Sequence, residues 1–501
     1  MKVKFGYESW AFQKEQKYIP VQWDSKKAVN PHVVLIGMSG AGKTHQLRSM
    51  ISQMCSTYDY SEQQLRIHVF DVHGDIEIES ASSVFFSEQT KFGLNPLEIN
   101  PDPDFGGVRK RIQSFMATMD KVMHSMGSKQ ESTMRNLLID LYNRCGFVQD
   151  DPSTWKAETV PQLLTSPEQA ERLYLDVPYE EKADANSLGA EWDGRPGIKS
   201  WWIPSANYNG GITRWPPKTL QRANPTIADL VRFTRHILLK SFLGTSQDAV
   251  TKLEAVNKIA RTITKRAIDL QKTVNLGSYD EKMLNDFDKA KDEALDRYKK
   301  YLESLSTGVE LEDVIKYSST DVLKSVLERI QNLEAMGIFK PDMPPFDKSS
   351  PVWRYNIVAL GLEERRLFVL FKLEELFLRA IQRGEQKDVC EVVVLDEAKI
   401  YLDDDPNNIL NKIANEGRKF GLALVAASQT PVHFTADFIA STATKVVLGV
   451  DESYWKQSAN LMRIDEKQLK WITPKRCMMV QMKAAGVTAT KWEYVVMTKP
   501  T

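Results

Sequence analysis

The sequence predicts an α/β protein whose central, mostly parallel sheet carries a large mixed and helical insertion. Apolar runs typical of buried strands alternate with helical patterns in two separate stretches, residues 31–150 and 345–501. Between them, residues 151–225 are rich in Trp, Pro and Gly, and residues 226–344 are helical. We therefore expect the two stretches to form one sheet domain. An arm (residues 1–30) precedes it, and a small Trp-rich domain with loops and a helical segment are inserted into it.

Apolar runs bounded by turn residues are the candidates for the strands of this sheet. They are residues 33–36, 65–70, 355–360, 389–395, 422–428, 445–450 and 478–482. A helical pattern follows the first run, with Leu47, Met50, Ile51 and Met54 on one face. Strands that alternate with helices in this way are typical of a parallel sheet.

Bulk composition excludes several classes of protein. The 501 residues contain 66 Lys and Arg and 66 Asp and Glu, so the net charge predicts neither a nucleic-acid nor a membrane partner, and any basic surface must be local. The 4 cysteines lie far apart, which argues against a disulfide framework or a zinc site. No apolar run approaches the length of a membrane span, so we expect a soluble, cytoplasmic protein without membrane insertion.

A phosphate-binding loop follows the first strand. Residues 37–44 are Gly-Met-Ser-Gly-Ala-Gly-Lys-Thr, which fits the P-loop pattern between a strand and a helix. The backbone N–H groups of such a loop surround nucleotide phosphates at a helix N-terminus. Lys43 would reach the β- and γ-phosphates of ATP, and the Thr44 hydroxyl would bind Mg²⁺. The expected nucleotide-binding residues are Gly37, Ser39, Gly40, Ala41, Gly42, Lys43, Thr44 and His45.

An acidic pair at the end of a second apolar strand completes the expected ATPase centre. The apolar residues 392–395 are followed by Asp396 and Glu397. Asp396 can hold Mg²⁺ through water, and Glu397 can orient or deprotonate the attacking water. Acidic residues often end strands, so the pair is a modest signal by itself. Downstream of a P-loop it becomes a strong one.

Two further residues are candidates for the catalytic centre. Gln429 ends the apolar run 422–428, where its amide could sense the γ-phosphate across the sheet edge. Arg418 lies just before the same run, from where it could face a neighbouring subunit as an arginine finger. The alternative for Arg418 is a cation that is favourable at a helix C-terminus, and the local sequence alone favours this alternative.

Together these motifs resemble the HerA branch of the HerA/FtsK superfamily, over residues 31–145 and 350–490. The residues that carry the resemblance are Asp396-Glu397-Ala398, Glu416-Gly417-Arg418-Lys419-Phe420-Gly421, Ser428-Gln429-Thr430-Pro431 and, in the second strand, Asp71-Val72-His73-Gly74-Asp75. The resemblance implies a RecA-like P-loop NTPase core, hexameric rings and the movement of double-stranded DNA through a central channel. It also implies that Gln429 is the sensor and that Arg418 acts in trans.

Two departures from this family leave an alternative open. Archaeal HerA proteins carry a large N-terminal β-barrel, whereas residues 1–32 are all that precede the first expected strand here. In addition, the Asn95-Pro96-Leu97 segment and the large insertion resemble the conjugation ATPases of type IV secretion. Those ATPases energise protein machinery instead of gripping DNA.

The insertion contains a resemblance of its own. Residues 172–206, through the segments 173–179, 188–193 and 199–204, are similar to a small domain of unknown function that is appended to plasmid DNA primases. This similarity indicates nucleic-acid metabolism and mobile elements without naming a reaction. The tryptophans of the domain could stack on bases, although in so small a domain we expect them to form the core.

The balanced total charge conceals a basic segment. Between Arg214 and Lys272 there are 12 Lys and Arg against 4 Asp and Glu, whereas residues 280–313 contain 6 against 11. Four of the basic residues share one helical face, and such a stripe suits contacts with DNA phosphates. They are Lys258, Arg261, Lys265 and Lys272. A solvated face, or pairing with the acidic helix that follows, is the alternative.

The leading hypothesis is therefore an ATP-driven, ring-forming DNA translocase or helicase that acts with a nuclease or another effector, in antiviral defence or mobile-element biology. A second hypothesis is a secretion or conjugation ATPase that acts on a membrane complex. A third is an ATP-gated oligomeric scaffold for an effector. DNA-stimulated ATPase activity separates the first from the second, and strand-displacement or roadblock assays separate the first from the third.

Overall fold

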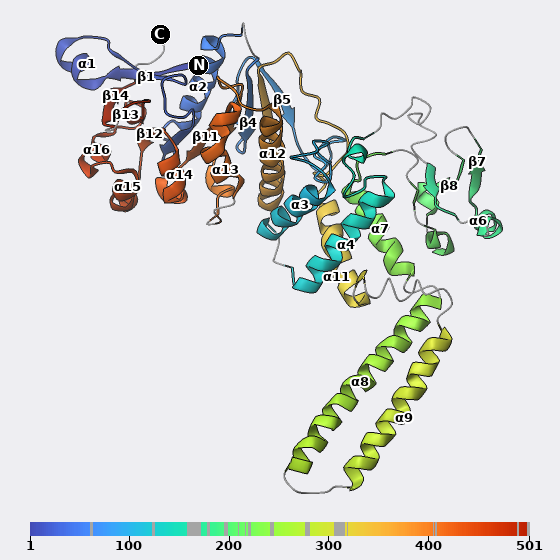
Figure 1. The fold of residues 1–501 in the computed structure, drawn as a ribbon. Helices are drawn as coiled ribbons and strands as arrows, with labels where there is room; N and C mark the ends of the chain where they lie inside the picture. The colour runs from blue at the N-terminus through green and yellow to red at the C-terminus, as the bar shows by residue number, and fades with distance from the viewer. Residues whose placement is uncertain are drawn as a thin grey trace. The chain divides into compact units, whose positions relative to one another are not determined.

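The protein consists of two compact units in the computed structural model (Figure 1). The structure describes residues 1–60, 64–122, 126–157, 172–177, 181–194, 199–208, 210–215, 217–218, 222–240, 245–275, 281–304, 316–317, 319–403, 405, 408–487 and 490–497. One unit, here called the sheet unit, comprises Met1–Asn95 and Met336–Thr501. The other, here called the helical unit, comprises Pro96–Ala335.

The sheet unit is built on one 11-stranded sheet. Its strands lie in the order β2 (Pro20–Asp24), β1 (Lys2–Glu8), β14 (Trp492–Val496), β13 (Cys477–Met482), β12 (Thr444–Gly449), β3 (Val33–Gly37), β11 (Leu422–Ser428), β10 (Glu391–Leu395), β4 (Arg66–Asp71), β9 (Val352–Asn356) and β5 (Ala81–Phe85). Neighbours are parallel from β12 to β5 and antiparallel from β12 to β2. The predicted central, mostly parallel sheet is confirmed.

Helices cover both faces of this sheet. They are α1 (Ser9–Glu15), α2 (Lys43–Thr57), α12 (Leu362–Arg383), α13 (Ile409–Glu416), α14 (Ala436–Ser441), α15 (Trp455–Met462) and α16 (Glu466–Trp471). On one face, Leu47 of α2 belongs to the same buried cluster as Val69 of β4. Successive strand residues point to opposite faces, and on the other face Phe70 stacks on Tyr355, which contacts Phe368 of α12. The parallel strands are therefore buried on both sides, as their continuous apolar runs require.

The first residues of the chain belong to the sheet. We expected an arm over residues 1–30, but β1 and β2 extend the sheet beyond β14. The reason lies in an alternating pattern within β1, where Val3 and Phe5 are buried and Lys2 is exposed. Trp23 of β2 is buried in the same way. This two-residue period marks strands that are covered on one face.

The helical unit contains a helix bundle, a long hairpin and a small sheet. The bundle consists of α3 (Val108–Val122), α4 (Ser128–Arg144), α7 (Ile227–Lys240) and α11 (Thr320–Ala335), which pack against one another. The hairpin consists of α8 (Thr245–Asn275) and α9 (Glu281–Ser304), which lie side by side (Figure 1). The small antiparallel sheet has the order β6 (Arg172–Leu175), β8 (Ser200–Pro204), β7 (Glu191–Asp193), and α6 (Lys182–Ser187) contributes to its core.

The unit boundaries differ from the ranges expected from the sequence. Residues 31–150 were expected to form the first half of the sheet domain, yet α3 and α4 belong to the helical unit, because α3 packs against α4 and α4 packs against α7 and α11. Residues 151–225 and 226–344 share this unit up to Ala335. The second half of the sheet unit begins at Met336 instead of residue 345. Among the described residues, no helix is long and apolar enough to cross a membrane.

Candidate active site

The P-loop connects β3 to α2 at the carboxyl edge of the parallel strands. Gly40 and Gly42 have φ angles of 77° and 98°, in the left-handed region that glycine tolerates. A side chain at Gly37 would place its Cβ 2.8 Å from Lys43 Cγ. Residues 37–45 therefore form a tight turn that ends in the first turn of α2, where backbone N–H groups lack helical partners. This loop can surround phosphates, as the sequence predicts.

Lys43 and Gln429 both contact Glu397. Lys43 Nζ lies 3.1 Å from Glu397 Oε1, and Gln429 Nε2 donates a hydrogen bond of 3.0 Å to the same oxygen. Lys43 begins α2, after the loop that follows β3, and Glu397 and Gln429 follow β10 and β11. These three strands are consecutive in the sheet, in the order β3, β11, β10. Burial alone raises the pKa of Glu397, but the Gln429 hydrogen bond and the Lys43 charge outweigh burial and hold this pKa below its ordinary value. Glu397 is thus an ionised, anchored carboxylate.

Asp396 differs from Glu397 in having no such anchor. Its side chain is buried, and its Oδ2 atom has no hydrogen-bond partner among the described residues. Burial raises the pKa of Asp396 to about 6, and the neighbouring carboxylates of Glu397 and Asp75 add to the rise, against the opposing charges of His73 and Lys43. A buried carboxylate in this state is prepared for a cation.

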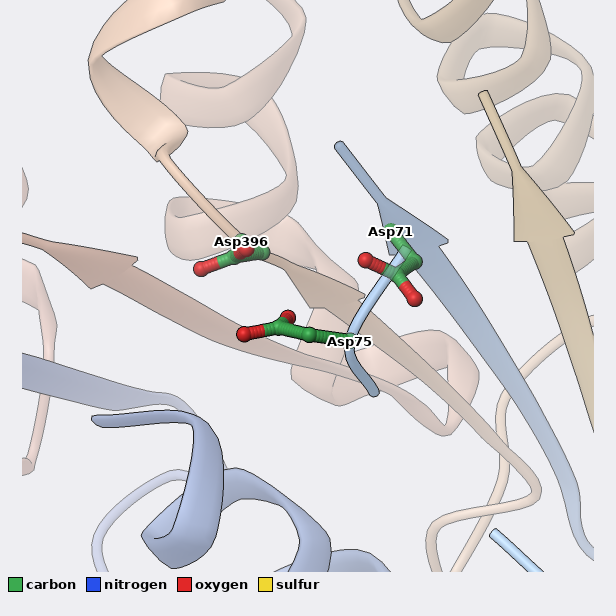
Figure 2. A group of neighbouring side chains, drawn as sticks. All are labelled: Asp71, Asp75 and Asp396. Atoms are coloured by element: carbon green, nitrogen blue, oxygen red, sulfur yellow. The ribbon is translucent and has the colours of Figure 1, made fainter. Parts of the chain in front are cut away.

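Asp71, Asp75 and Asp396 bring carboxylate oxygens within 4.8 Å of one another (Figure 2). Both carboxylate oxygens of Asp71 accept hydrogen bonds within the chain. Oδ2 accepts one of 2.7 Å from Arg354 Nη2, and Oδ1 accepts one of 2.7 Å from the Gly74 N–H. Asp75 Oδ2 accepts a hydrogen bond of 3.1 Å from Thr44 Oγ1. Oxygen atoms are the ligands that Mg²⁺ prefers. The oxygens of Thr44, Asp75 and Asp396 therefore fit a magnesium ion, whereas Asp71 holds the loop.

Sequence reasoning identified the Asp71–Asp75 motif but missed the partner that holds it. Arg354 lies within β9, whose residues we expected to start at Tyr355, because a charged residue interrupts the apolar pattern. The arginine is tolerated there since Asp71 accepts two of its hydrogen bonds and the Gly74 carbonyl accepts a third. The alignment of Arg354 with Val69, next to Asp71, in the parallel pair β4–β9 follows from register and could not be read from sequence.

Arg418 lies at the opposite edge of the sheet. It belongs to the turn η7 (Gly417–Phe420), which precedes β11, whereas Gln429 follows β11. At about 3.3 Å per residue, the seven residues of β11 separate these edges by roughly 20 Å. Arg418 therefore does not reach the P-loop of its own chain. Burial and, to a smaller extent, the charge of Arg418 lower the pKa of His32, which lies just before β3, to about 3.

The Arg418 side chain is exposed in a charged cleft of about 810 Å³. Two other cations of this cleft are paired, since Lys26 Nζ lies 3.1 Å from Asp388 and Lys419 Nζ lies 2.9 Å from Glu385. Arg418 makes no ion pair with any described residue. It is thus available to a group from outside the chain.

The expected DNA-binding residues lie on α8 of the helical unit. Lys258, Arg261, Lys265 and Lys272 are all exposed, whereas Ile259 is buried. Within the described residues, none of the four forms an ion pair with α9, whose acids pair within their own helix, as in Arg297–Glu293 and Lys300–Asp296. Among the described residues, the alternative of pairing with the following acidic helix is not observed. The exposed stripe remains a predicted contact for phosphates.

Comparison with known proteins agrees with this site. Residues 11–104, which include the P-loop and the Asp71–Asp75 loop, match the family model described as helicase HerA, central domain. This part of the chain is similar to the central domain of HerA helicases. The match ends before Asp396, Glu397, Arg418 and Gln429, so those four residues are placed by the structure and by sequence motif.

Two further comparisons concern the fold and the insert. The structure of VirB4 of Thermoanaerobacter pseudethanolicus is similar, with a TM-score of 0.53 at 12% identity, over 99% of this chain and 96% of that chain. At this identity the likeness concerns the fold, which the two chains share over nearly their whole lengths. Residues 172–217 match a domain of unknown function. A 54-residue segment is 42% identical to DNA primase TraC of Escherichia coli, and it covers 11% of this chain and 4% of the primase.

Proposed function

We propose that the protein binds and hydrolyses ATP with Mg²⁺ at the carboxyl edge of the sheet unit. The observation that carries this proposal is the convergence of Lys43 and Gln429 on one oxygen of Glu397, beside the unpartnered Asp396. The P-loop supplies the phosphate cradle, and Thr44 and Asp396 supply oxygens for the ion. Mg²⁺, when bound there, would neutralise charge on the phosphates.

The same contacts support a mechanism in which the catalytic base becomes active only when ATP is bound. Lys43 Nζ pairs directly with the Glu397 carboxylate, at 3.1 Å. The phosphates of ATP attract Lys43, which leaves the Glu397 carboxylate free to orient or deprotonate a water molecule. Gln429 keeps Glu397 in position and lies where the γ-phosphate would be sensed. Lys43 and Gln429 thus couple occupancy of the P-loop to the readiness of the base.

The active site would be completed by a second copy of the chain. Arg418 lies at the edge of the sheet remote from its own P-loop, exposed and without an ion-pair partner among the described residues. An arginine in this state can stabilise transition-state charge at a neighbour's nucleotide. A closed homo-oligomeric ring repeats one such contact at every interface. Six subunits is the number that the family resemblance implies.

The proposed substrate of the motor is double-stranded DNA. The basic stripe on α8 gives four exposed cations at spacings of three, four and seven residues, and none of them pairs with a described residue of α9. Contacts of Lys and Arg with phosphates make binding sequence-independent and salt-dependent. A nuclease or another effector would use the movement, in antiviral defence or mobile-element biology.

A second candidate function is a secretion or conjugation ATPase that acts on a membrane complex. The likeness to VirB4 favours it, because that likeness extends over nearly the whole of both chains. A motor of this kind needs the same P-loop chemistry but no DNA. The two functions therefore differ in the partner, not in the active site.

Phosphate release from ATP by the full-length protein, with and without duplex DNA, tests the proposal. We expect Mg²⁺-dependent hydrolysis that Lys43→Ala abolishes, a rise in rate when duplex is added, and DNA binding that falls steeply with salt. Hydrolysis without any DNA binding at low salt would reject the translocase and place the secretion-type ATPase first. No hydrolysis by assembled wild-type protein would reject the ATPase itself.

A further inference from the structure

The antiparallel strand β13 brings a short loop to the same sheet edge as the P-loop. β13 runs antiparallel to β12, with Val447 opposite Met479 and Thr444 opposite Met482. The beginning of β13 therefore lies where β12 and β3 end. The residues just before β13, Thr473 to Arg476, connect it to α16. Two of them, Lys475 and Arg476, are cations.

This loop packs directly on the P-loop. Pro474 Cγ lies 3.7 Å from the position that a Cβ on Gly449 would take, and Ala41 Cβ lies at the same distance from that position. At Gly42, the first atom that a Cβ would meet is Lys475 Cγ, at 3.8 Å. The aliphatic stem of Lys475 thus passes over Gly42, the residue just before α2. Phosphates bind at this helix terminus in a P-loop.

The ammonium group of Lys475 has no ion-pair partner among the described residues. The side chain is exposed, and it has no ion pair or hydrogen bond with the described residues. Its amine is therefore free to contact a bound ligand. By contrast, Lys43 on the inner side of the loop is already held by Glu397.

The backbone at Lys475 is unusual for a lysine. Its φ angle is 64°, in the left-handed region that favours glycine. The turn is fixed by hydrogen bonds from the N–H groups of Arg476 and Cys477 to the Thr473 carbonyl, at 3.0 and 2.9 Å. Non-glycine residues held in this region are concentrated at functional sites. A lysine at a position where glycine would fit more easily indicates a use for the side chain.

We propose that Lys475 donates a hydrogen bond to a phosphate of the bound nucleotide, as a second cation beside Lys43. This inference rests on the proposed function, because it concerns the same nucleotide. Lys475 approaches the outer side of the loop at Gly42, away from Glu397 and Gln429, so it acts in binding instead of in bond cleavage. ADP and ATP share the phosphates that it can reach. Its contribution should therefore be equal in the ground state and the transition state.

The test compares Lys475→Ala, Lys475→Gly and Lys475→Arg with the wild type, by titration of a fluorescent ADP analogue in Mg²⁺. We expect Lys475→Ala and Lys475→Gly to bind about tenfold more weakly, as for loss of one charged hydrogen bond. The KM for ATP should rise by the same factor while kcat stays within about twofold. Lys475→Arg keeps the charge and should retain most of the affinity.

Two controls separate charge from folding. Lys475→Gly suits the left-handed backbone, so its thermal stability should match or exceed that of the wild type. Lys467→Ala removes an exposed lysine from α16, which precedes this loop, and should change nothing. Wild-type affinity in Lys475→Gly, or Lys475→Arg as weak as Lys475→Gly, would overturn the inference. Absence of binding by the wild type itself would instead overturn the proposed function, and this inference with it.

Discussion

The two edges of the sheet in the sheet unit differ in how their charged side chains are buried and paired. At the carboxyl edge, Lys43, Asp396 and Glu397 are buried or nearly so, and Glu397 is tied to two partners. At the amino edge, Arg418 is exposed beside cations that already have carboxylate partners. The carboxyl edge holds the proposed nucleotide site, whereas at the amino edge Arg418 forms no ion pair with any described residue. About 20 Å of parallel strand separates them.

If Arg418 takes part in the proposed hydrolysis, it must act on the nucleotide of a second copy of the chain, because it lies at the far edge of its own sheet. Arg418 could meet the P-loop of its own chain only if β11, which lies between the two edges, were much shorter than its seven residues. In a head-to-tail ring, the amino edge of one copy can face the carboxyl edge of the next. The following predictions test whether the two edges have these separate roles.

The largest effect is expected at Glu397. Glu397→Gln keeps the hydrogen-bonding shape but cannot accept a proton, so ATP should still bind while kcat falls about a thousandfold. Lys43→Ala should instead weaken nucleotide binding itself. Measurements of steady-state hydrolysis and of ADP-analogue binding distinguish the two. Glu385→Gln is the control at the amino edge, where the pair with Lys419 is exposed and worth little. Normal turnover by Glu397→Gln would move the base elsewhere.

Asp396 and Asp71 provide a second contrast, in stability. The folded pKa of Asp396 is about 6 against an ordinary 3.8, so ionisation is costlier in the folded state and its cost is complete above pH 6. Asp396→Asn should therefore stabilise the Mg²⁺-free protein at pH 7 by about 3 kcal/mol, and the gain should vanish as the pH falls towards 4. Added Mg²⁺ and ADP should reverse the order, because only the wild type binds the ion well.

Asp71→Asn is the matched control for that contrast. It removes the charge that Arg354 pairs with and should destabilise the protein by about 3 kcal/mol, since a buried arginine is left without its partner. Thermal unfolding of both variants at pH 7 and pH 5 measures the difference. Equal destabilisation by Asp396→Asn and Asp71→Asn would show that Asp396 has a structural partner after all.

The smallest effect is expected on the helical unit. Replacing Lys258, Arg261 and Lys265 together by Ala should weaken DNA binding and flatten its salt dependence by about one unit per lost phosphate contact. Basal hydrolysis should stay unchanged, because these residues belong to the other unit. The triple replacement of Lys289, Lys299 and Lys300 on α9 removes the same charge from the same hairpin and is the control. An unchanged slope would show that the α8 stripe is only solvated.

The sequence alone was enough to identify the candidate residues that belong to short motifs with a fixed spacing. The P-loop and the Asp396-Glu397 pair each follow one apolar strand, so order along the chain already placed them at one edge. Parallel strands also imply that Gln429 would join them, and its hydrogen bond to Glu397 agrees. The edge position of Arg418 followed in the same way, because it precedes the strand that Gln429 ends.

What the sequence did not reveal depends on register and on distant pairing. Arg354 is 283 residues from Asp71, and only the alignment of β9 with β4 brings them together. Lys475 reaches the P-loop because β13 turns antiparallel beside β12, which apolar runs cannot predict. The strands β1 and β2 had a readable alternating pattern, with Val3 and Phe5 buried, but few residues to carry it.

The central claim, that the two edges of different copies meet to form one site, is tested by mixing two inactive proteins. Lys43→Ala lacks the phosphate-binding lysine but keeps Arg418, and Arg418→Ala has the opposite defect. In equimolar mixed rings, about a quarter of the interfaces would join an intact P-loop to an intact Arg418. We predict that each protein alone is silent and that hydrolysis returns on mixing, in proportion to such interfaces. Mixed rings that form but stay silent at every ratio would contradict the account.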